Sequence, residues 1–266
     1  MEPDSSFLEL AKESTHRYNV NEYRFAQPVL QWFSLHEDCL PLEKMHEGRW
    51  GRRLRDHEAA KGTGDSSSRS LIHKHWKSAP PEILCAFDAE FRRFIVEVVA
   101  PLMGGPVYYE HRPAFRFHLP VFDHKRPLMQ PHCDADYHHQ SHEINFWIPL
   151  SNNIGDCNSL FVESEPGKGD YRPFNDVPYG TFKKFYGNKC RHYTVQNRSE
   201  WTRCSFDFRV VRKCDYRHDA PESMNKEGKN RFKVGEFYRS SEVDEAVIDE
   251  GEIERSGLGG VGEGGE

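Results

Sequence analysis

The clearest hydrophobic pattern in the chain predicts one long amphipathic helix. Between Ile83 and Leu102, apolar residues recur at spacings of one, three and four positions, which gathers them on one broad face of a helix. Two prolines precede this stretch, and Gly104-Gly105-Pro106 follows it, as expected where a helix begins and ends. We therefore expect a helix over residues 82–103, with its apolar face packed on a sheet.

From residue 107 onward the pattern changes to short segments in which polar and apolar residues alternate. Such segments, separated by Pro, Gly and Asn, are typical of a sandwich or barrel rather than of a parallel sheet. In the last segment, Arg203, Ser205, Asp207 and Arg209 share one face, and apolar residues share the other. That polar face has a functional role if it lines a barrel interior. The predicted strands are Val107–Glu110, Ala114–Leu119, Glu143–Pro149, Ser159–Glu163, Cys190–Val195 and Trp201–Val211.

The acidic residues divide the chain into a nearly neutral body and an acidic end. The formal net charge is −6, but residues 242–266 hold nine acidic residues and one arginine, so the remaining 241 residues carry a net charge of +2. We expect residues 242–266 to form a disordered, Gly-rich tail, since they have little apolar surface to bury. We expect residues 71–241 to form the core, and residues 1–70 to form a helical or irregular segment that packs on it. A body near neutrality gives no electrostatic case for binding nucleic acid.

The composition also bears on the cellular compartment. No run of 18 apolar residues is present, so no membrane span is expected, and the first residues lack the basic and apolar regions of a secretory signal. The seven cysteines are scattered, and no two form a C-x-x-C pair. An odd number of scattered cysteines without an export signal indicates free thiols in a reducing compartment. We therefore expect a cytoplasmic protein.

An H-x-D pattern and a later histidine carry the candidate chemistry. His132 and Asp134 are two residues apart, so in an extended segment their side chains point to the same side. His192 follows sixty residues later and can complete the set from a neighbouring strand. Two histidines and one carboxylate are the ligands that non-haem Fe(II) oxygenases use, and they leave positions open on the metal. A second H-x-D, at residues 36–38, has no such partner, and we interpret it as surface.

Arg203 and Ser205 add a possible anchor for a co-substrate. 2-Oxoglutarate can chelate iron through its C1 carboxylate and keto oxygen, and its distal carboxylate then needs a cation deep in the site. A guanidinium is permanently charged and binds a carboxylate in a fork, while the hydroxyl of Ser205 adds a donor from the same strand face. The H-x-D pattern, His192, and Arg203 with Ser205 follow one another along the chain. This order indicates such a site more specifically than any one of these residues does.

Four segments of the chain resemble the Fe(II)/2-oxoglutarate-dependent oxygenases. They are residues 131–137, 143–150, 202–209 and 112–116, and the resemblance extends over about residues 105–212. Within that family the sequence is most similar to the StrG-type, streptomycin-biosynthesis-like branch, to which algal kainoid synthases are also similar. The resemblance implies a mainly β fold with flanking helices around a double-stranded β-helix, which is a jelly-roll, cupin-like core. It also implies Fe(II), 2-oxoglutarate and O2 as cofactor and co-substrates.

Further polar and aromatic side chains are candidates for binding. Asn145 is expected to hydrogen-bond the co-substrate or the substrate, with a structural role as the alternative. Arg116 and His118 share a strand face that either lines the barrel or meets solvent. His138, in a histidine-rich segment, either faces substrate, belongs to a polar loop at the barrel mouth or joins another metal site. The residues predicted to bind substrate are Arg116, His118, His138, Trp147 and Arg209. For Arg209, the alternatives are contact with a buried acid and an ion pair on the surface. Eight other histidines are expected at the surface: His16, His46, His57, His73, His75, His111, His124 and His218.

These features together predict an Fe(II)- and 2-oxoglutarate-dependent dioxygenase. It would hydroxylate or oxidatively cyclise a small polar metabolite, such as an amino-acid derivative, in specialised metabolism. The alternatives are a jelly-roll metal-binding protein without turnover and an oxygenase that acts on a peptide. The sequence leaves open the identity of the substrate and the oligomeric state.

Overall fold

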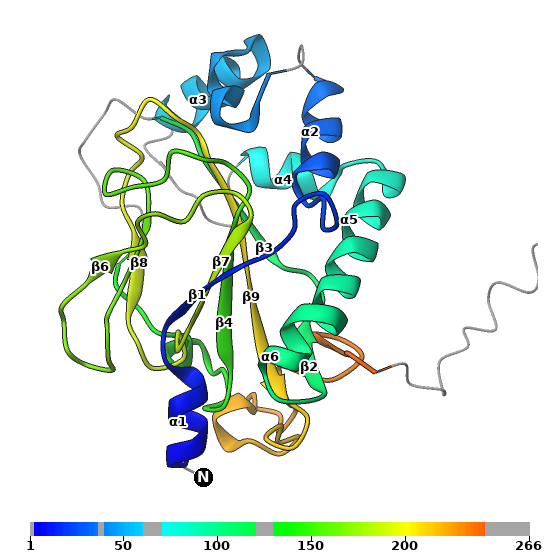
Figure 1. Cartoon of the computed structure of the whole chain (residues 1–266), viewed down its shortest axis with the longest axis vertical. Helices are drawn as coiled ribbons and strands as arrows, with labels where there is room; N and C mark the ends of the chain where they lie inside the picture. Colours follow the sequence, from blue (N-terminus) through cyan, green and yellow to red (C-terminus); the bar gives the residue numbers. More distant parts are fainter. Residues whose placement is uncertain (1–2, 37–39, 61–70, 121–129, 243–266) are drawn as a thin grey trace, which may run out of the picture.

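A computed structural model describes residues 3–36, 40–60, 71–120 and 130–242 of the chain. The predicted acidic tail, apart from its first residue, and the second and third residues of the 36–38 pattern lie outside the described residues. In Figure 1, helices gather on one side of a large sheet, and a smaller sheet lies on the other. None of the helices in the described residues has the length and hydrophobicity needed to cross a bilayer.

The predicted long helix belongs to a layer of helices on one side of the large sheet. The predicted helix is found as α5 (Pro81–Phe94), a π-helical turn (Ile95–Val99) and α6 (Ala100–Leu102). It runs along the large sheet because Phe87, Phe91 and Phe94 are almost fully buried on its inner face. The other helices are α1 (Ser5–Ala11), α2 (Ala26–Ser34), α3 (Arg49–Ala60) and α4 (Leu71–Lys77), with 3-10 helices at Leu42–Glu47, Asp134–Tyr137 and Pro221–Ser223.

The strands form two antiparallel sheets. The large sheet has the order β1 (Ser14–Arg17), β7 (Thr181–Phe185), β4 (Ile144–Pro149), β9 (Arg203–Arg212), β2 (Val107–Glu110) and β10 (Tyr238–Ser240), with β3 (Ala114–His118) also paired to β9. The small sheet has the order β6 (Arg172–Pro173), β5 (Leu160–Val162) and β8 (His192–Thr194).

The connections between the two sheets define the fold class. After β3 in the large sheet, His132 makes an isolated antiparallel bridge to β8 of the small sheet. The chain then passes through β4 of the large sheet, β5 and β6 of the small sheet, β7 of the large, β8 of the small and β9 of the large. Successive crossing between two facing antiparallel sheets is the jelly-roll arrangement. The predicted fold, a jelly-roll core with flanking helices, is therefore confirmed.

The six predicted strands are found with shifts of at most two residues at their ends, whereas β1, β6, β7 and β10 were not predicted. β1 consists of four polar or basic residues, and β6 has only two residues, so neither has a readable alternation. β7 contains two adjacent lysines between phenylalanines, which hides its period of two. These three segments are strands because β1 pairs with β7, β7 pairs with β4 and β6 pairs with β5.

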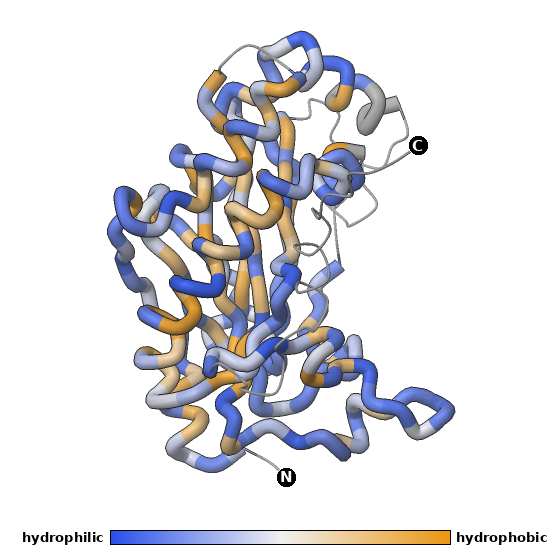
Figure 2. The backbone as a smooth tube through the Cα atoms, turned by 90° about the vertical axis from the view of Figure 1, so that its right-hand side faces the viewer, coloured by the Kyte–Doolittle hydropathy of each residue, from blue (hydrophilic) through white to orange (hydrophobic). Residues whose placement is uncertain are grey.

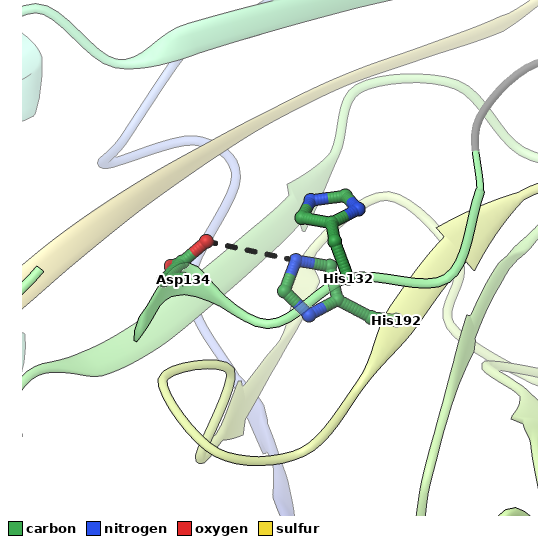
Figure 3. Close-up of side chains that lie close together, drawn as sticks. All are labelled: His132, Asp134 and His192. Carbon is green, nitrogen blue, oxygen red and sulfur yellow. Dashed lines mark ion pairs between the residues drawn. The ribbon is translucent and has the colours of Figure 1, made fainter. Parts of the chain in front are cut away.

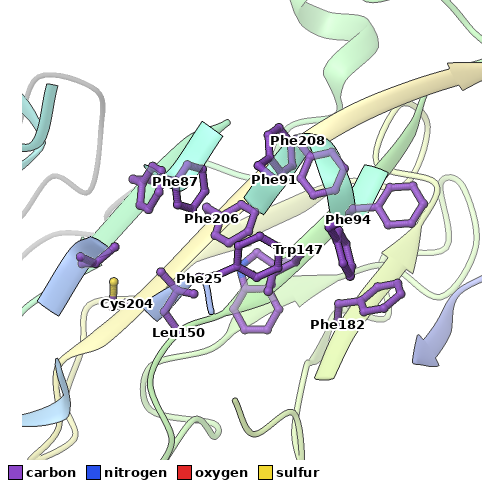
Figure 4. Packing of buried hydrophobic residues seen from close by; sticks show 14 of the residues in the cluster. Phe25, Phe87, Phe91, Phe94, Trp147, Leu150, Phe182, Cys204, Phe206 and Phe208 are labelled. Carbon is purple, nitrogen blue, oxygen red and sulfur yellow. The ribbon is translucent and has the colours of Figure 1, made fainter. Parts of the chain in front are cut away.

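The hydrophobic core lies between the large sheet and the helices. Figure 2 shows hydrophobic residues concentrated in the strands of the large sheet, within more hydrophilic loops. Phe206 and Phe208 of β9 contact the rings of α5, with ring centroids of Phe91 and Phe208 4.8 Å apart. Phe25, which precedes α2, packs edge-on against Phe206 at 5.3 Å. Figure 4 shows this cluster, in which the N-terminal segment supplies part of the core.

Two histidines expected at the surface are buried, so those predictions were wrong. His46 lies under the start of β9, where its Nδ1 is 2.9 Å from the hydroxyl of Thr202. His73 of α4 faces β3, and its Nδ1 is 3.2 Å from the carbonyl oxygen of Phe115. Each contact joins segments far apart in the chain, which local periodicity does not show.

Phe206→Ala is expected to lower the free energy of unfolding by about 3–5 kcal/mol, because it removes a fully buried ring shared by α2, α5 and β3. Urea unfolding followed by circular dichroism measures this. Leu35→Ala, at a side chain that is 60% exposed, should change the free energy by less than about 0.5 kcal/mol. Equal effects of the two substitutions would contradict the described core.

Candidate metal centre

The fold brings His132, Asp134 and His192 to one place between the two sheets. His132 and His192 exchange two backbone hydrogen bonds, of 3.2 and 2.7 Å, so their rings lie side by side with centroids 4.5 Å apart. Asp134 begins a 3-10 helix, and its backbone N–H donates to the carbonyl oxygen of Gly187. One ligand atom from each of the three side chains lies within 4.8 Å of the others. Figure 3 shows the three side chains converging, with Asp134 Oδ1 3.8 Å from His192 Nε2.

The backbone around both histidines selects the nitrogen that each can offer to a metal. His132 Nδ1 is 3.1 Å from the carbonyl oxygen of Gln130, and His192 Nδ1 is 3.1 Å from that of Cys190. A carbonyl oxygen only accepts, so Nδ1 carries the proton and the Nε2 lone pair is free. Burial, with the neighbouring His192, lowers the pKa of His132. Neutral imidazoles with free Nε2 atoms are good ligands for a transition metal.

Asp134 is buried and ionised. Its side chain is 1% exposed, and burial by itself would raise its pKa, but the charge of Arg209 outweighs that effect and holds the pKa well below its usual value. Arg209 donates from Nε to Oδ2 at 2.8 Å and from Nη2 to Oδ1 at 3.2 Å. Asn145 Nδ2 donates to Oδ2 at 2.6 Å. The carboxylate is therefore fixed in place before any metal binds.

Arg203 is a buried cation without a carboxylate partner. It is 1% exposed, and among the described residues no carboxylate lies within 4.0 Å of its guanidinium nitrogens. Its Nη1 donates to the carbonyl oxygen of Asn158 at 2.8 Å, and its Nη2 is 3.1 Å from His118 Nε2. Its Nε and the buried hydroxyl of Ser205 have no hydrogen-bond partner. Burial, together with the charge of Arg116, lowers the pKa of Arg203 to about 9.

A narrow cavity of about 40 Å³ connects these groups between the sheets. Most of the sequence-predicted site residues line it: Arg116, His132, Asn145, Trp147, His192, Arg203 and Arg209. Asp134 lies against Arg209 and Asn145 in its wall, and His118 and Ser205 lie beside Arg203 on the same sheet face. His138 does not line this cavity. It is exposed, with φ 73°, at the end of the short helix that begins at Asp134.

Asp207 also lines this cavity, and Glu110 contacts Arg209; sequence reasoning singled out neither acid. Asp207 accepts from Arg116 Nε at 3.0 Å, and Glu110 accepts from Arg209 Nη1 at 3.0 Å. Asp207 shares the polar face of its strand with Arg203 and Arg209, so the alternation contained a signal for it. Glu110 ends β2 and reaches Arg209 only through the pairing of β2 with β9, so no local pattern points to it.

A second, larger cavity of about 640 Å³ lies between α4, α5 and the turn from β2 to β3. Leu84, Phe87 and Phe115 form an apolar wall, and Lys77, Asp88 and Arg112 bring charges to it. Arg116 borders both cavities. We call the narrow one the inner cavity and the larger one the outer cavity.

The chain is similar to a curated protein of antibiotic biosynthesis. It is 29% identical over 160 residues to the streptomycin biosynthesis protein StrG of Streptomyces griseus, and the match covers 55% of this chain and 73% of StrG. This match confirms the resemblance to the StrG-type branch. No family model matches the chain.

Solved structures with some likeness include non-heme oxygenases. The non-heme monooxygenase ThoJ in complex with nickel has 13% identity and a TM-score of 0.41, covering 78% of this chain and 76% of ThoJ. The epimerase SnoN, in complex with Fe3+, alpha-ketoglutarate and nogalamycin RO, has 13% identity and a TM-score of 0.37, covering 58% and 74%. The rice dioxygenase for auxin oxidation has 14% identity and a TM-score of 0.39, covering 89% and 85%. Because these TM-scores are below 0.5, the fold assignment rests on the strand order described above.

Gly187→Ala is expected to lower the free energy of unfolding by about 1–3 kcal/mol, as overpacking does. A Cβ at this position would lie 2.5–2.7 Å from three side-chain atoms of Asn145, which is itself held by Asp134. Thermal unfolding measures the effect. Gly155→Ala is the matched control, since a Cβ there meets no atom within 4 Å and should be tolerated. Equal stability of the two variants would show that Asn145 has room to move.

Proposed function

We propose that this protein is an Fe(II)- and 2-oxoglutarate-dependent oxygenase, with His132, Asp134 and His192 as the iron ligands. The observation that carries the proposal is the pairing of this ligand set with a buried, unpaired Arg203 in one cavity. A site that only binds metal has no use for such a cation. A co-substrate that binds the metal at one end and carries a carboxylate at the other requires both.

The ligand set suits iron. Two neutral imidazoles and one ionised carboxylate form the 2-His-1-carboxylate arrangement of non-haem Fe(II) oxygenases, which leaves coordination positions open. Cys133 lies between the first two ligands in sequence, but its sulfur does not belong to the group that could hold a metal ion. A structural zinc site would fill four positions with protein ligands, often including thiolates.

The surroundings of Arg203 suit the distal carboxylate of 2-oxoglutarate. Burying an unpaired guanidinium is costly, and a bound carboxylate would offset that cost. Its unpartnered Nε and the unpartnered hydroxyl of Ser205 are two donors for the incoming oxygens. His118 holds the other edge of the guanidinium, so we assign His118 to orienting Arg203 rather than to substrate. The inner cavity is narrow, so binding would widen it through changes in its side chains.

The chain's own residues bind, orient and shield the reactants. When bound, iron, 2-oxoglutarate and O2 together supply the oxidation of an unactivated C–H bond. His132, Asp134 and His192 hold the metal, and Arg203 with Ser205 fixes the far end of the co-substrate. Trp147, which is 1% exposed, borders the same cavity and keeps water away from it. The outcome, hydroxylation or ring closure, depends on which substrate atom these walls place next to the metal.

The outer cavity is the proposed substrate site. Its volume of about 640 Å³ is in the range of small-molecule pockets, and it adjoins the inner cavity at Arg116. Among the described residues, Lys77, Asp88 and Arg112 have no ion-pair partner within 4.0 Å. Unpaired charges of both signs beside an apolar wall suit a small zwitterion with an apolar body, such as an amino-acid derivative. The similarity to StrG supports a role in specialised metabolism.

Arg203→Met is expected to weaken 2-oxoglutarate binding at least about 100-fold, because removing one partner of a buried ion pair costs about 3–5 kcal/mol. Metal binding should stay near that of the wild type. Anaerobic calorimetry with Mn²⁺, then with 2-oxoglutarate, separates the two steps. His132→Ala should instead lose metal binding and substrate-dependent succinate formation.

Two controls make this test decisive. Arg172→Met removes an exposed arginine and should change neither the metal affinity nor the 2-oxoglutarate affinity. Unchanged 2-oxoglutarate affinity in Arg203→Met would contradict the proposed anchor. A wild-type protein that binds metal but no 2-oxoglutarate would favour the alternative of a metal-binding protein without turnover.

Leu84→Trp is expected to abolish substrate-triggered succinate formation by filling the outer cavity, while 2-oxoglutarate affinity stays within about twofold, since Leu84 does not line the inner cavity. The measurement is a panel of amino acids and derivatives, each as the zwitterion, the N-acetyl form and the methyl ester. Zwitterions should trigger the most succinate formation. Asp88→Asn should reduce the preference for zwitterions over N-acetyl forms, which lack the ammonium group. Leu8→Trp, at a residue of α1 that is 46% exposed, is the control. Unchanged triggering in Leu84→Trp would place the substrate elsewhere.

A further inference from the structure

The two oxygens of Asp134 have different surroundings. Oδ2 accepts from Asn145 Nδ2 at 2.6 Å and from Arg209 Nε at 2.8 Å. From the residues that the structure describes, Oδ1 accepts a single, longer bond, of 3.2 Å, from Arg209 Nη2. Oδ1 is also the oxygen that faces His192 Nε2, at 3.8 Å. Two short bonds therefore hold Oδ2 in the protein wall, while Oδ1 points toward the two histidines.

Each guanidinium nitrogen of Arg209 contacts an acid of the protein. Its Nη1 donates to Glu110 at 3.0 Å and lies 3.6 Å from Asp207, while Nε and Nη2 donate to Asp134. All three guanidinium nitrogens thus donate to acids of the protein, which agrees with the alternative expectation that Arg209 reaches a buried acid. Glu110 and Asp207 also balance its charge, so Arg209 can hold a carboxylate without strongly repelling a metal ion nearby.

Strand register fixes the second donor. Asn145 of β4 lies directly opposite Arg209 of β9, so both side chains project from neighbouring strands onto the same carboxylate. Gly187 lies so close to the Asn145 amide that any Cβ would collide with it. The amide is thereby confined against Asp134. The carbonyl oxygen of the Asn145 side chain has no hydrogen-bond partner. Within the described residues, the Asn145 side chain therefore makes one hydrogen bond, the one to Asp134.

We propose that Arg209 and Asn145 are positioning residues that restrict Asp134 to binding the metal through Oδ1 alone. The inference rests on the proposed function. On a six-coordinate ion, two histidines and one carboxylate oxygen leave three positions, whereas a carboxylate that binds through both oxygens leaves two. A keto acid that binds through two atoms, together with O2, needs three. The hydrogen bonds to Oδ2 therefore keep open the position that the reaction requires.

The test measures Co²⁺ binding by calorimetry and the visible spectrum of the bound Co²⁺, neither of which depends on turnover. Arg209→Gln and Asn145→Ala are each expected to weaken Co²⁺ binding about 10–100-fold, as loss of groups that orient a metal ligand does. Both should alter the intensity of the Co²⁺ bands, because the ligand number changes. In both, 2-oxoglutarate should bind the Co²⁺ protein more weakly although Arg203 is intact.

Arg209→Lys separates geometry from charge. It keeps the positive charge beside Glu110, and thus the folded state, but cannot donate in a fork to both Asp134 oxygens. We expect its Co²⁺ spectrum to resemble that of Arg209→Gln. Arg212→Gln is the matched control, since Arg212 lies on the same strand and pairs with Asp215 instead. It should bind Co²⁺ as the wild type does.

The possible failures are distinguishable. Wild-type affinity and an unchanged Co²⁺ spectrum in both Arg209→Lys and Asn145→Ala would overturn this inference and leave the proposed function intact. A spectrum of Arg209→Lys identical to that of the wild type, with only Arg209→Gln altered, would overturn the geometric role in favour of charge alone. A wild-type protein that binds Co²⁺ no better than His192→Ala would overturn the proposed function, and this inference with it.

Discussion

The ion pair between Arg209 and Asp134 is the interaction on which the rest of the site depends. Asp134 is buried and the Arg209 side chain is only 12% exposed, and a charge so enclosed is strongly unfavourable without a partner. Glu110 and Asp207 extend the pair into a cluster in which each acid contacts Arg209. Because the acids come from three separate segments, the cluster can form only when β2, β9 and the turn after His132 are in their native places. The charges thus link the candidate metal centre to correct assembly of the sheets.

Strand β9 connects this cluster to the hydrophobic core. Its inner face carries Arg203, Ser205, Asp207 and Arg209, and its outer face carries residues such as Phe206 that pack under α5. A slip of one residue in its pairing with β4 would exchange the two faces and bury charges among aromatic rings. The aromatic packing therefore sets the register of the polar face. In this way the core determines which side chains reach the candidate metal centre.

In the proposed function the two cavities have separate tasks. The inner cavity holds the metal ligands and the buried arginine, and the outer cavity offers apolar surface and unpaired charges at its rim. Arg116 lines both cavities, and its partner Asp207 lines the inner one. Such a division lets the outer wall vary with the substrate while the metal centre stays the same, since the two sets of residues share only Arg116.

Local patterns in the sequence were enough for six strands, the long helix and the polar face of β9, because periodicity is a property of neighbouring residues. The grouping of His132, Asp134, His192 and Arg203 came instead from the order of these residues along the chain and from the resemblance to the oxygenases. Local patterns were not enough for β1 and β7, which become strands only by pairing with each other and with β4. Nor did they predict the burial of His73, or that Arg209 and Asn145 hold Asp134, since these contacts join residues from 11 to 75 positions apart. The sequence by itself determined which chemistry the chain can carry. Only the tertiary structure decided which oxygen of Asp134 faces the histidines and which charges are left without a partner, because the packing of strands and helices brings those atoms together.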